Sequence, residues 1–291
     1  MPPASWGLVD ANISMLFTEL PLTDRPAAAR AAGFAAIEAW WPFGSAIPPD
    51  AEVAGFERAV RDAGVKLVAL NGFAGNMAAG DRGILSWPGR QQEFTDNLDV
   101  VMELGTRLGC RRFNLLYGNR IDGTAAAEQD ELAAANLARA TRAAQQAGAV
   151  VVVEPLSGVP EYPLRTADDV LGVLGRLPAA LADSARLLDD LYHLRVNGAD
   201  IPATLDRVHA RIGHVQVADV PGRHEPGTGT ADLDGWVRQL RQLGYDQWVG
   251  LEYAPLETTT AGLPYLGLAG EAAAPSTAPP QPPPPQPQQR A

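Results

Sequence analysis

The sequence predicts a (β/α)8 TIM barrel followed by a disordered, proline-rich C-terminal tail. Eight short apolar or alternating runs recur along the chain, and most are followed by an Ala-rich or amphipathic segment with helical periodicity. Glycines stand shortly before several of these runs, where the end of a helix needs a residue that tolerates positive φ. Eight such β-then-α units are typical of a closed barrel. A doubly wound sheet is the alternative, because strand runs alone do not report closure.

The predicted strands are distributed over the chain from its N-terminus to residue 253. In chain order they cover residues 11–17, 34–40, 65–71, 111–117, 149–154, 185–190, 214–218 and 248–253. The helical segments between them carry their own signals. In the segment 97–109, four apolar residues and a glycine fall on one helical face, and the segment 166–177 opens with Thr166, which is suited to an N-cap, followed by acids in the first turn.

Length and composition divide the chain into one large domain and a tail. Residues 1–268 are predicted to form a single catalytic barrel, because α/β barrels of ~250 residues occur as one unit. Residues 269–291 are rich in Pro, Gln and Ala, and from Glu271 on there is no aliphatic side chain larger than Ala. Such a segment cannot bury enough apolar surface to offset its ordering entropy, which predicts disorder with polyproline II character.

Charge and cysteine content argue against several classes of protein. The formal net charge is −11 at pH 7 and the pI is about 4.8, which disfavours a nucleic-acid partner because phosphate binding needs a basic surface. The sequence has neither the features of a signal peptide nor a run of the ~20 apolar residues that span a membrane. Its single cysteine, Cys110, cannot form an internal disulfide and is expected to be a small core residue. These features favour a cytoplasmic protein and are compatible with a homo-oligomer.

Polar side chains stand at the ends of the predicted strands, where a barrel carries its chemistry. They are Glu38, Asn71, Tyr117, Glu154, Asp190, Gln216 and Glu252. The last four follow strands five to eight at intervals of 36, 26 and 36 residues. In a closed barrel their side chains converge at one rim.

Three of these four side chains are carboxylates, and three anions in a partly buried cup repel one another unless a cation neutralises them. Oxygen ligands favour a hard divalent ion, Mg²⁺ or Mn²⁺, and the sequence lacks the Cys pairs and the His-x-x-x-His pattern of a structural zinc site. A lone acid at a strand end is as often a salt-bridge partner or an N-cap. Glu154 is harder to explain in that way, because four valines precede it and Pro155 ends the strand. Asp189 and Asp190 are alternatives, since only one of two successive residues faces the barrel interior.

Taken together, several motifs identify the chain as similar to the hydroxypyruvate isomerase family, within the xylose isomerase-like TIM-barrel superfamily. They are "NISMLFTELPLTDRPAAARAAGFAAIEAWWPF", "NGFAGNMAAGDRGILSWPGR", "VVVEPLS", "LLDDLYHLRVNGAD", "HVQVADVPGRHEPGTG" and "GLEYAP". The resemblance runs from about residue 11 to residue 266. The chain departs from the family pattern after "EY", where a basic residue is often found and "EYAPLETTT" has none.

The resemblance implies a divalent metal held by Glu154, Asp190, Gln216 and Glu252. The aspartate three residues before a histidine is the family's ligand, which selects Asp190 over Asp189 and adds His193 as a substrate-binding candidate. Glu154 and Glu252 are implied as the proton-transfer pair. The expected reaction interconverts hydroxypyruvate and 2-hydroxy-3-oxopropanoate (tartronate semialdehyde) through an enediolate, with the metal as Lewis acid.

The loop after strand seven supplies three further substrate-binding candidates. Arg223 is expected to pair with the substrate carboxylate, because a planar guanidinium binds a carboxylate directionally. His224 and Glu225 are expected to shape or orient that site. The alternatives are a solvated loop cation for Arg223 and a structural role for His224.

Other functions use the same ring of residues. An isomerase or epimerase of a longer 2-oxo sugar acid, such as a 2-oxo-tetronate, or of a ketose needs only a different pocket. A dehydratase of the same barrel superfamily, a metal-assisted hydride shift in place of proton transfer, and a non-catalytic sugar-acid binder also stay open. An endonuclease is disfavoured, because it needs a His-rich multi-zinc cluster and a basic face, and this chain has 4 histidines and a net charge of −11.

Overall fold

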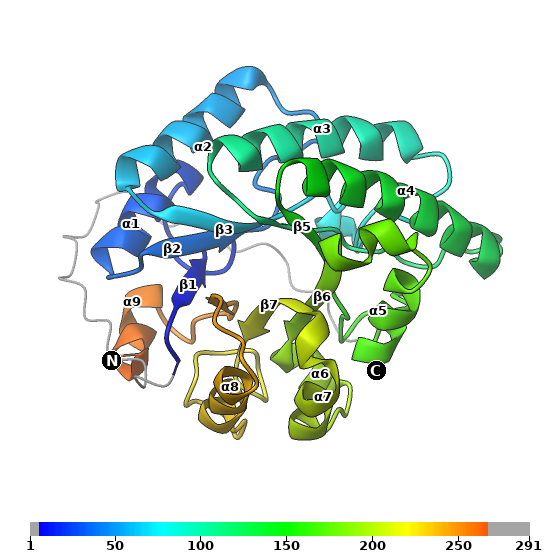
Figure 1. The fold of residues 1–291 in the computed structure, drawn as a ribbon. Coiled ribbons are helices and arrows are strands. Elements are labelled where there is room, and N and C mark those ends of the chain that lie inside the picture. Colours follow the sequence, from blue (N-terminus) through cyan, green and yellow to red (C-terminus); the bar gives the residue numbers. More distant parts are fainter. Residues whose placement is uncertain (1–5, 267–291) are drawn as a thin grey trace.

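The computed structural model describes residues 6–266, which form a closed barrel of parallel strands surrounded by helices (Figure 1). Each strand pairs with its neighbours in chain order, and β8 closes on β1. The predicted barrel is therefore confirmed and the doubly wound sheet is excluded. The predicted tail, residues 269–291, lies outside the described residues.

The strands are short and most lie within the predicted runs. They are β1 Val9–Asn12, β2 Ala36–Ala39, β3 Lys66–Asn71, β4 Arg112–Asn114, β5 Val150–Val153, β6 Ala185–Asp190, β7 Ile212–Val217 and β8 Val249–Leu251. The prediction for the first strand, 11–17, was wrong in its bounds, because the strand begins two residues earlier and ends at Asn12. The chain turns directly after Asn12, where the N–H groups of Met15 and Leu16 donate to the Asn12 carbonyl at 3.1 and 2.8 Å.

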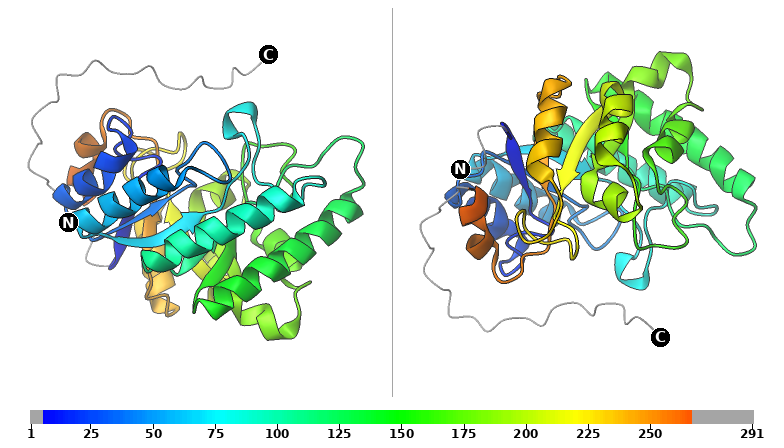
Figure 2. Two further views of the ribbon diagram at one scale, coloured as in Figure 1. Left: turned by 90° about the horizontal axis from the view of Figure 1, so that it is seen from above. Right: turned by 90° about the horizontal axis from the view of Figure 1, so that it is seen from below.

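Helices cover the outside of the barrel. They are α1 Arg25–Ala31, α2 Asp50–Ala63, α3 Gln91–Arg107, α4 Ala126–Gln146, α5 Ala167–Leu174, α6 Leu191–Val196, α7 Ile201–Val208, α8 Leu233–Gln242 and α9 Thr259–Gly262. Helices α2, α3 and α4 lie along one side, and α6, α7 and α8 lie on the other (Figures 1 and 2). The predicted cap of α5 is confirmed, because Thr166 and Asp169 form a reciprocal capping box. No helix among residues 6–266 has both the length and the apolar character to cross a membrane.

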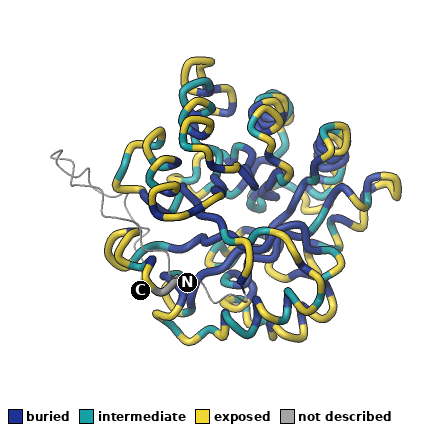
Figure 3. Tube along the Cα trace, turned by 60° about the vertical axis from the view of Figure 1, so that its left-hand side comes forward, coloured by how far each residue is buried: buried dark blue, intermediate teal, exposed yellow. Residues whose placement is uncertain are grey.

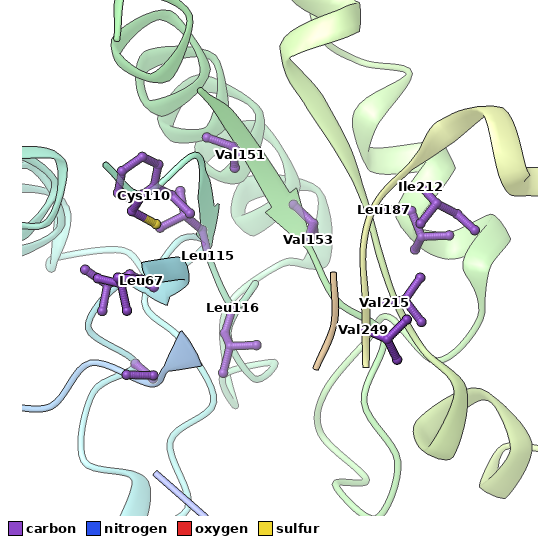
Figure 4. Packing of buried hydrophobic residues seen from close by; sticks show 14 of the residues in the cluster. Leu67, Cys110, Leu115, Leu116, Val151, Val153, Leu187, Ile212, Val215 and Val249 are labelled. Atoms are coloured by element: carbon purple, nitrogen blue, oxygen red, sulfur yellow. The ribbon is translucent and has the colours of Figure 1, made fainter. Parts of the chain in front are cut away.

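The core lies inside the barrel and between the strands and the helices. Buried residues follow the strands and the inner helix faces, and exposed residues lie on the outer turns (Figure 3). Figure 4 shows part of this core, including Cys110, Val151 and Leu187, which are 0–1% exposed. The prediction of Cys110 as a core residue is confirmed.

The strand register brings the carboxyl ends of neighbouring strands to one rim. Asp190 is level with Gln216, Gln216 is level with Gly250, and Asn12 is level with Glu38. Residues at these positions therefore face one another although up to 240 residues separate them along the chain. The candidate site is a consequence of this register.

Two helical glycines offer a matched test of how closely the helices pack on the barrel. A Cβ at Gly105 of α3 would lie 2.3 Å from Cε1 of the buried Phe113, whereas a Cβ at Gly55 of α2 would have no heavy atom within 4 Å. We expect Gly105→Ala to lower the free energy of unfolding by about 1–3 kcal/mol through overpacking. Gly55→Ala should raise it by up to about 1 kcal/mol, because alanine loses less backbone entropy on folding. Urea unfolding followed by circular dichroism measures both, and a neutral Gly105→Ala would contradict the close approach.

Candidate active site

The four polar residues predicted at the ends of strands five to eight lie together at the carboxyl rim. All four are buried, with exposed fractions of 1–4%. The Gln216 amide donates from Nε2 to Oε2 of Glu252 at 2.5 Å. Glu154, Asp190 and His193 each offer a ligand atom within 4.8 Å of the others. Asp190, rather than Asp189, belongs to this group.

Two acceptor atoms in this group have no hydrogen-bond partner among the described residues. Asp190 uses Oδ1 to cap α6, where it accepts from the N–H groups of Tyr192 and His193 at 2.8 and 3.1 Å. Its Oδ2 is buried and accepts no hydrogen bond, and the Arg223 guanidinium is 3.6 Å away. Gln216 uses both donor positions of its amide, so its Oε1 is likewise buried and unpartnered. A buried acceptor without a partner is costly unless a donor or a cation satisfies it.

The chemistry of this donor set fits a hard divalent ion. The unpartnered oxygens of Asp190 and Gln216 stand beside the carboxylates of Glu154 and Glu252, which gives an all-oxygen set. Glu154, Asp190, Gln216 and Glu252 could therefore hold the ion that the sequence predicts.

Two asparagines hold the two glutamates in place. Asn12 donates from Nδ2 to Glu38 Oε1 at 2.9 Å and to Glu252 Oε2 at 2.7 Å. Asn114, at the end of β4, donates to Glu154 Oε2 at 2.8 Å. Sequence reasoning missed Asn114, although an asparagine at a strand end was the available signal. These amides leave each glutamate with oxygen lone pairs for a further partner.

A second buried group lies behind this layer, formed by Asp10, Glu38 and His214. His214 Nε2 is 2.5 Å from Glu38 Oε2, and Glu38 Oε1 accepts from Gln216 at 2.8 Å. Gly250 makes the room for Glu38, because a Cβ there would lie 2.7 Å from the Glu38 carboxylate. Glu38 therefore contacts Gln216 and Asn12 from behind the rim. Asp10 was not predicted as a site residue, because it lies just before the predicted first strand, 11–17.

Burial and mutual repulsion raise the pKa values of the rim carboxylates. Burial raises the pKa of Glu252 to about 8, with Arg223 opposing the rise and Glu38 and Asp190 adding to it. Burial likewise raises the pKa of Asp190 to about 6, although Arg223 and two backbone N–H groups favour its ionised form. The pKa of Glu154 is raised well above its ordinary value by burial and by the charges of Glu252 and Asp190. Protonated carboxyl groups and a bound cation are the two ways to relieve this crowding.

Arg223 counters part of this negative charge. Its Nη2 donates to Glu252 Oε1 at 2.5 Å and lies 3.6 Å from Asp190 Oδ2. The guanidinium also stacks over the Tyr192 ring at 5.3 Å. The backbone of Arg223 has a φ of 59°, a left-handed conformation that is uncommon for a residue with a side chain, and the Ala254 N–H donates to its carbonyl. The expected substrate carboxylate would thus meet an arginine that already contacts two protein carboxylates.

His224 and Glu225 fasten the loop after β7 to the loop after β8. His224 Nδ1 is 2.8 Å from the Ala254 carbonyl, and the Glu225 carboxylate accepts from the Leu256 N–H at 3.0 Å. Neither side chain lines the cavity at the rim. Because Arg223 lies in the loop between β7 and these two residues, their contacts restrict where the Arg223 backbone can lie. This arrangement is compatible with the expectation that His224 and Glu225 shape the site.

His193 presents one ring nitrogen to the carboxylates. Its Nδ1 accepts from the Ser157 N–H at 3.0 Å, so in the neutral ring the proton is on Nε2. Nε2 lies 3.6 Å from Asp190 Oδ2 and 3.8 Å from Glu154 Oε1. Burial, together with the charges of Arg223 and Arg82, holds the pKa of His193 well below its usual range. The ring is therefore a neutral hydrogen-bond donor at the site.

A cavity of about 190 Å³ opens onto this group. Its lining includes Glu154, Glu252, His193, Arg223 and Arg82. A second cavity, of about 450 Å³, shares Trp40, Asn71 and Met77 with the first and continues past Phe73 and Arg90. Two carboxyl groups of raised pKa thus face a space large enough for a small molecule.

The comparisons with known proteins agree with the barrel fold. A family model described as a xylose isomerase-like TIM barrel matches residues 26–267. A predicted hydroxypyruvate isomerase of Streptomyces coelicolor is 48% identical over 257 residues, which cover 87% of this chain and 92% of the relative. A 2-oxo-tetronate isomerase of Cupriavidus necator is 35% identical over 264 residues, which cover 88% of this chain and 98% of the relative. A crystal structure from Brucella melitensis, of a protein described as an AP endonuclease of family 2, has a TM-score of 0.82 and 28% identity, with 91% of this chain and all of that chain covered.

The closed barrel and its rim of buried acids define an enzyme of the TIM-barrel class, and the chain belongs to the xylose isomerase-like TIM-barrel family. More particularly, its similarity to hydroxypyruvate and 2-oxo-tetronate isomerases shows that it is an isomerase, which is an intramolecular oxidoreductase. The family resemblance predicted from the sequence motifs is confirmed.

The raised pKa values predict that metal binding strengthens with pH. A carboxyl group whose pKa is raised by folding stabilises the metal-free protein below its ordinary pKa, and this contribution is lost as the pH rises through the raised value. For Asp190 and Glu252 these values are about 6 and about 8. Because a cation binds the ionised forms, the difference in Tm between protein with excess Mn²⁺ and protein with EDTA should widen from pH 6 to pH 8.5.

Differential scanning fluorimetry measures this difference at each pH. In Glu252→Gln the widening above pH 7 should be smaller, because the group that titrates there is gone. A difference in Tm that is the same at every pH would show that these carboxyl groups do not bind the ion.

Proposed function

We propose that the protein is a metal-dependent isomerase that interconverts hydroxypyruvate and 2-hydroxy-3-oxopropanoate through an enediolate. The observation that carries this proposal is the pair of buried glutamates, Glu154 and Glu252, which line one cavity beside two unpartnered oxygen ligands. An isomerisation of an α-hydroxycarbonyl needs a base and an acid at adjacent carbons, together with a means of holding two substrate oxygens.

The metal site would consist of Glu154, Asp190, Gln216 and Glu252. A divalent ion bound there, Mg²⁺ or Mn²⁺, would act as a Lewis acid on the carbonyl and hydroxyl oxygens of the substrate. Gln216 suits this set because its Oε1 is free while its Nε2 is committed to Glu38 and Glu252. The asparagines at positions 12 and 114 would keep the two glutamates in a fixed orientation.

The proton would be moved by the chain's own carboxylates. A glutamate with a pKa of about 8, such as Glu252 without the ion, holds and releases a proton near neutral pH. One of the pair would take the proton from the carbon that bears the hydroxyl, and the same or the other glutamate would return a proton to the neighbouring carbon. The hydroxyl proton would pass to the former carbonyl oxygen, so that the hydroxyl and carbonyl groups exchange places. Arg223 would hold the Glu252 carboxylate in place, and His193 would donate from Nε2 to a substrate oxygen.

A second substrate is favoured by the adjoining cavity. Its volume of about 450 Å³ exceeds what a three-carbon acid needs, and it opens from the same residues that border the catalytic glutamates. A four-carbon 2-oxo acid, such as the 2-oxo-tetronate on which the Cupriavidus relative is named to act, would extend into this space. The same pair of glutamates would serve both substrates.

A role on nucleic acid is not part of this proposal. The net charge of −11 repels a polyphosphate, and the glutamates lie in a cavity of about 190 Å³. We further propose a single catalytic domain over residues 1–268 and a cytoplasmic location; the oligomeric state stays a prediction.

Turnover of purified protein on a small panel of substrates tests the proposal. We expect hydroxypyruvate, or a 2-oxo-tetronate, to be isomerised, with the activity lost after EDTA treatment and restored by Mg²⁺ or Mn²⁺. Proton NMR of the product made in D₂O should show deuterium on the carbon that gains hydrogen, because proton transfer exchanges with solvent. Retention of all substrate hydrogen would indicate a hydride shift, and turnover that is insensitive to EDTA would contradict the metal.

Replacing one glutamate separates acid–base chemistry from folding. Glu252→Gln keeps an oxygen acceptor at the position but cannot carry the proton, so we expect kcat to fall by at least about 10²-fold. Circular dichroism and Tm should stay close to those of the wild type. The control is Glu57→Gln, which replaces an acid of α2 that pairs with Arg61 and Arg107 and does not line the cavity. Full activity in Glu252→Gln would remove it from the proton-transfer pair.

A further inference from the structure

One residue that lines the cavity, Arg82, takes no part in the proposed proton transfer. It stands on the loop between β3 and α3 and borders the same cavity as Glu154, His193 and Arg223. Its Nη1 donates to the backbone carbonyls of Met77 and Asp81 at 3.1 and 2.7 Å. Within residues 6–266 no carboxylate lies within ion-pair distance of its guanidinium.

The acids near Arg82 pair with other arginines, so none of them neutralises the charge of the Arg82 guanidinium. Arg223 contacts both Glu252 and Asp190. The closest acid in the sequence, Asp81, accepts from the Asn76 N–H at 2.7 Å and pairs with Arg90 at 3.4 Å. Arg82 is therefore the arginine of this cavity whose charge no described carboxylate neutralises. Burial lowers its pKa and Asp81 opposes that effect, so a partly desolvated cation faces the cavity.

The loop that carries Arg82 is fixed in place on both sides. The Gly118 N–H donates to the Arg82 carbonyl at 2.9 Å, and the Gly83 N–H donates to the Ala74 carbonyl at 2.8 Å. Gly83 has a φ of 103°, and a Cβ there would lie 2.0 Å from the Leu116 carbonyl oxygen. Only glycine allows this contact, so the backbone positions Arg82 against the loop after β4 before any ligand binds.

We propose that Arg82 binds the carboxylate of the substrate and thereby selects 2-oxo acids over neutral ketoses. This inference rests on the proposed function. When the carbonyl carbon and the hydroxymethyl carbon of hydroxypyruvate face Glu154 and Glu252, the carboxylate is the only charged group of the substrate and requires a cation on the cavity wall. Arg223 is engaged with the protein's own acids, whereas Arg82 offers guanidinium N–H groups and a full positive charge.

Substitution of Arg82 by glutamine tests this assignment with two kinds of ligand. We expect Arg82→Gln to raise KM for hydroxypyruvate by about 10- to 100-fold, as loss of a charge-assisted hydrogen bond does, and to change kcat much less. Turnover of dihydroxyacetone, in which a hydroxymethyl group replaces the carboxylate, should be unaffected where it is measurable. Arg82→Lys should restore part of the loss.

A binding measurement makes the test independent of turnover. Calorimetric titration of Mn²⁺-loaded protein with glycerate, which resembles the substrate but cannot isomerise, should show the same 10- to 100-fold loss in Arg82→Gln. The control is Arg120→Gln, which removes a rim arginine that pairs with Asp130 and does not line the cavity. Tm and Mn²⁺ affinity should match the wild type in both variants.

The possible outcomes separate this inference from the proposed function. Unchanged KM and unchanged glycerate affinity in Arg82→Gln, with both lost in Arg223→Gln, would assign the carboxylate to Arg223 and overturn the inference alone. Wild-type protein that binds glycerate through Arg82 but isomerises no acid of the panel would contradict the proposed function and support the inference.

Discussion

The structure depends on one constraint, which is the burial of four carboxylates at the carboxyl rim of the barrel. Glu38, Glu154, Asp190 and Glu252 are each 4% exposed or less. Ionised acids so close together repel strongly in a medium from which water is excluded. The surrounding groups are therefore donors or cations: two asparagines, the Gln216 amide, the first N–H groups of α6, and Arg223. Even so, burial keeps the pKa values of three of these acids raised, so the set is incomplete without protons or a cation.

Closure of the barrel turns this crowding into a defined site. Parallel pairing places Asp190 level with Gln216 and Gln216 level with Gly250, so side chains from successive strands meet without any loop rearrangement. Gly250 leaves room for Glu38 because it has no side chain, and any side chain there would occupy the position of the Glu38 carboxylate. Rigid strands thus fix the acids, while the loops after β3, β5 and β7 supply Arg82, Ser157 and Arg223 around the cavity. The barrel fold thus holds the acids on rigid strands and lets the loops supply the residues proposed to select the substrate.

The sequence placed Glu154, Gln216 and Glu252 at the ends of their strands, whereas only the family resemblance selected Asp190 over Asp189. Four valines before Glu154 and a proline after it mark the point where the chain leaves the core. It could not predict the layer behind them. The pair Glu38–His214 joins residues 176 positions apart, and nothing local to either residue indicates the contact. Asp10 was not predicted for a different reason. The apolar alternation continues past Asn12, so the predicted first strand began too late in the sequence. Its buried acid, Asp10, therefore lay outside the predicted bounds.

The amide at position 216 shows why a neutral residue stands among so many acids. A glutamate there would add a fifth negative charge and, when ionised, could only accept hydrogen bonds. The amide instead donates to Glu38 and Glu252 at once, which draws two repelling carboxylates together, and it still presents an oxygen of its own. Its orientation follows from those two donations, because the flipped amide would set an oxygen against two carboxylates. Gln216 therefore links the supporting layer to the proposed ligands, and the glutamate that would carry the proton is held by the same contact.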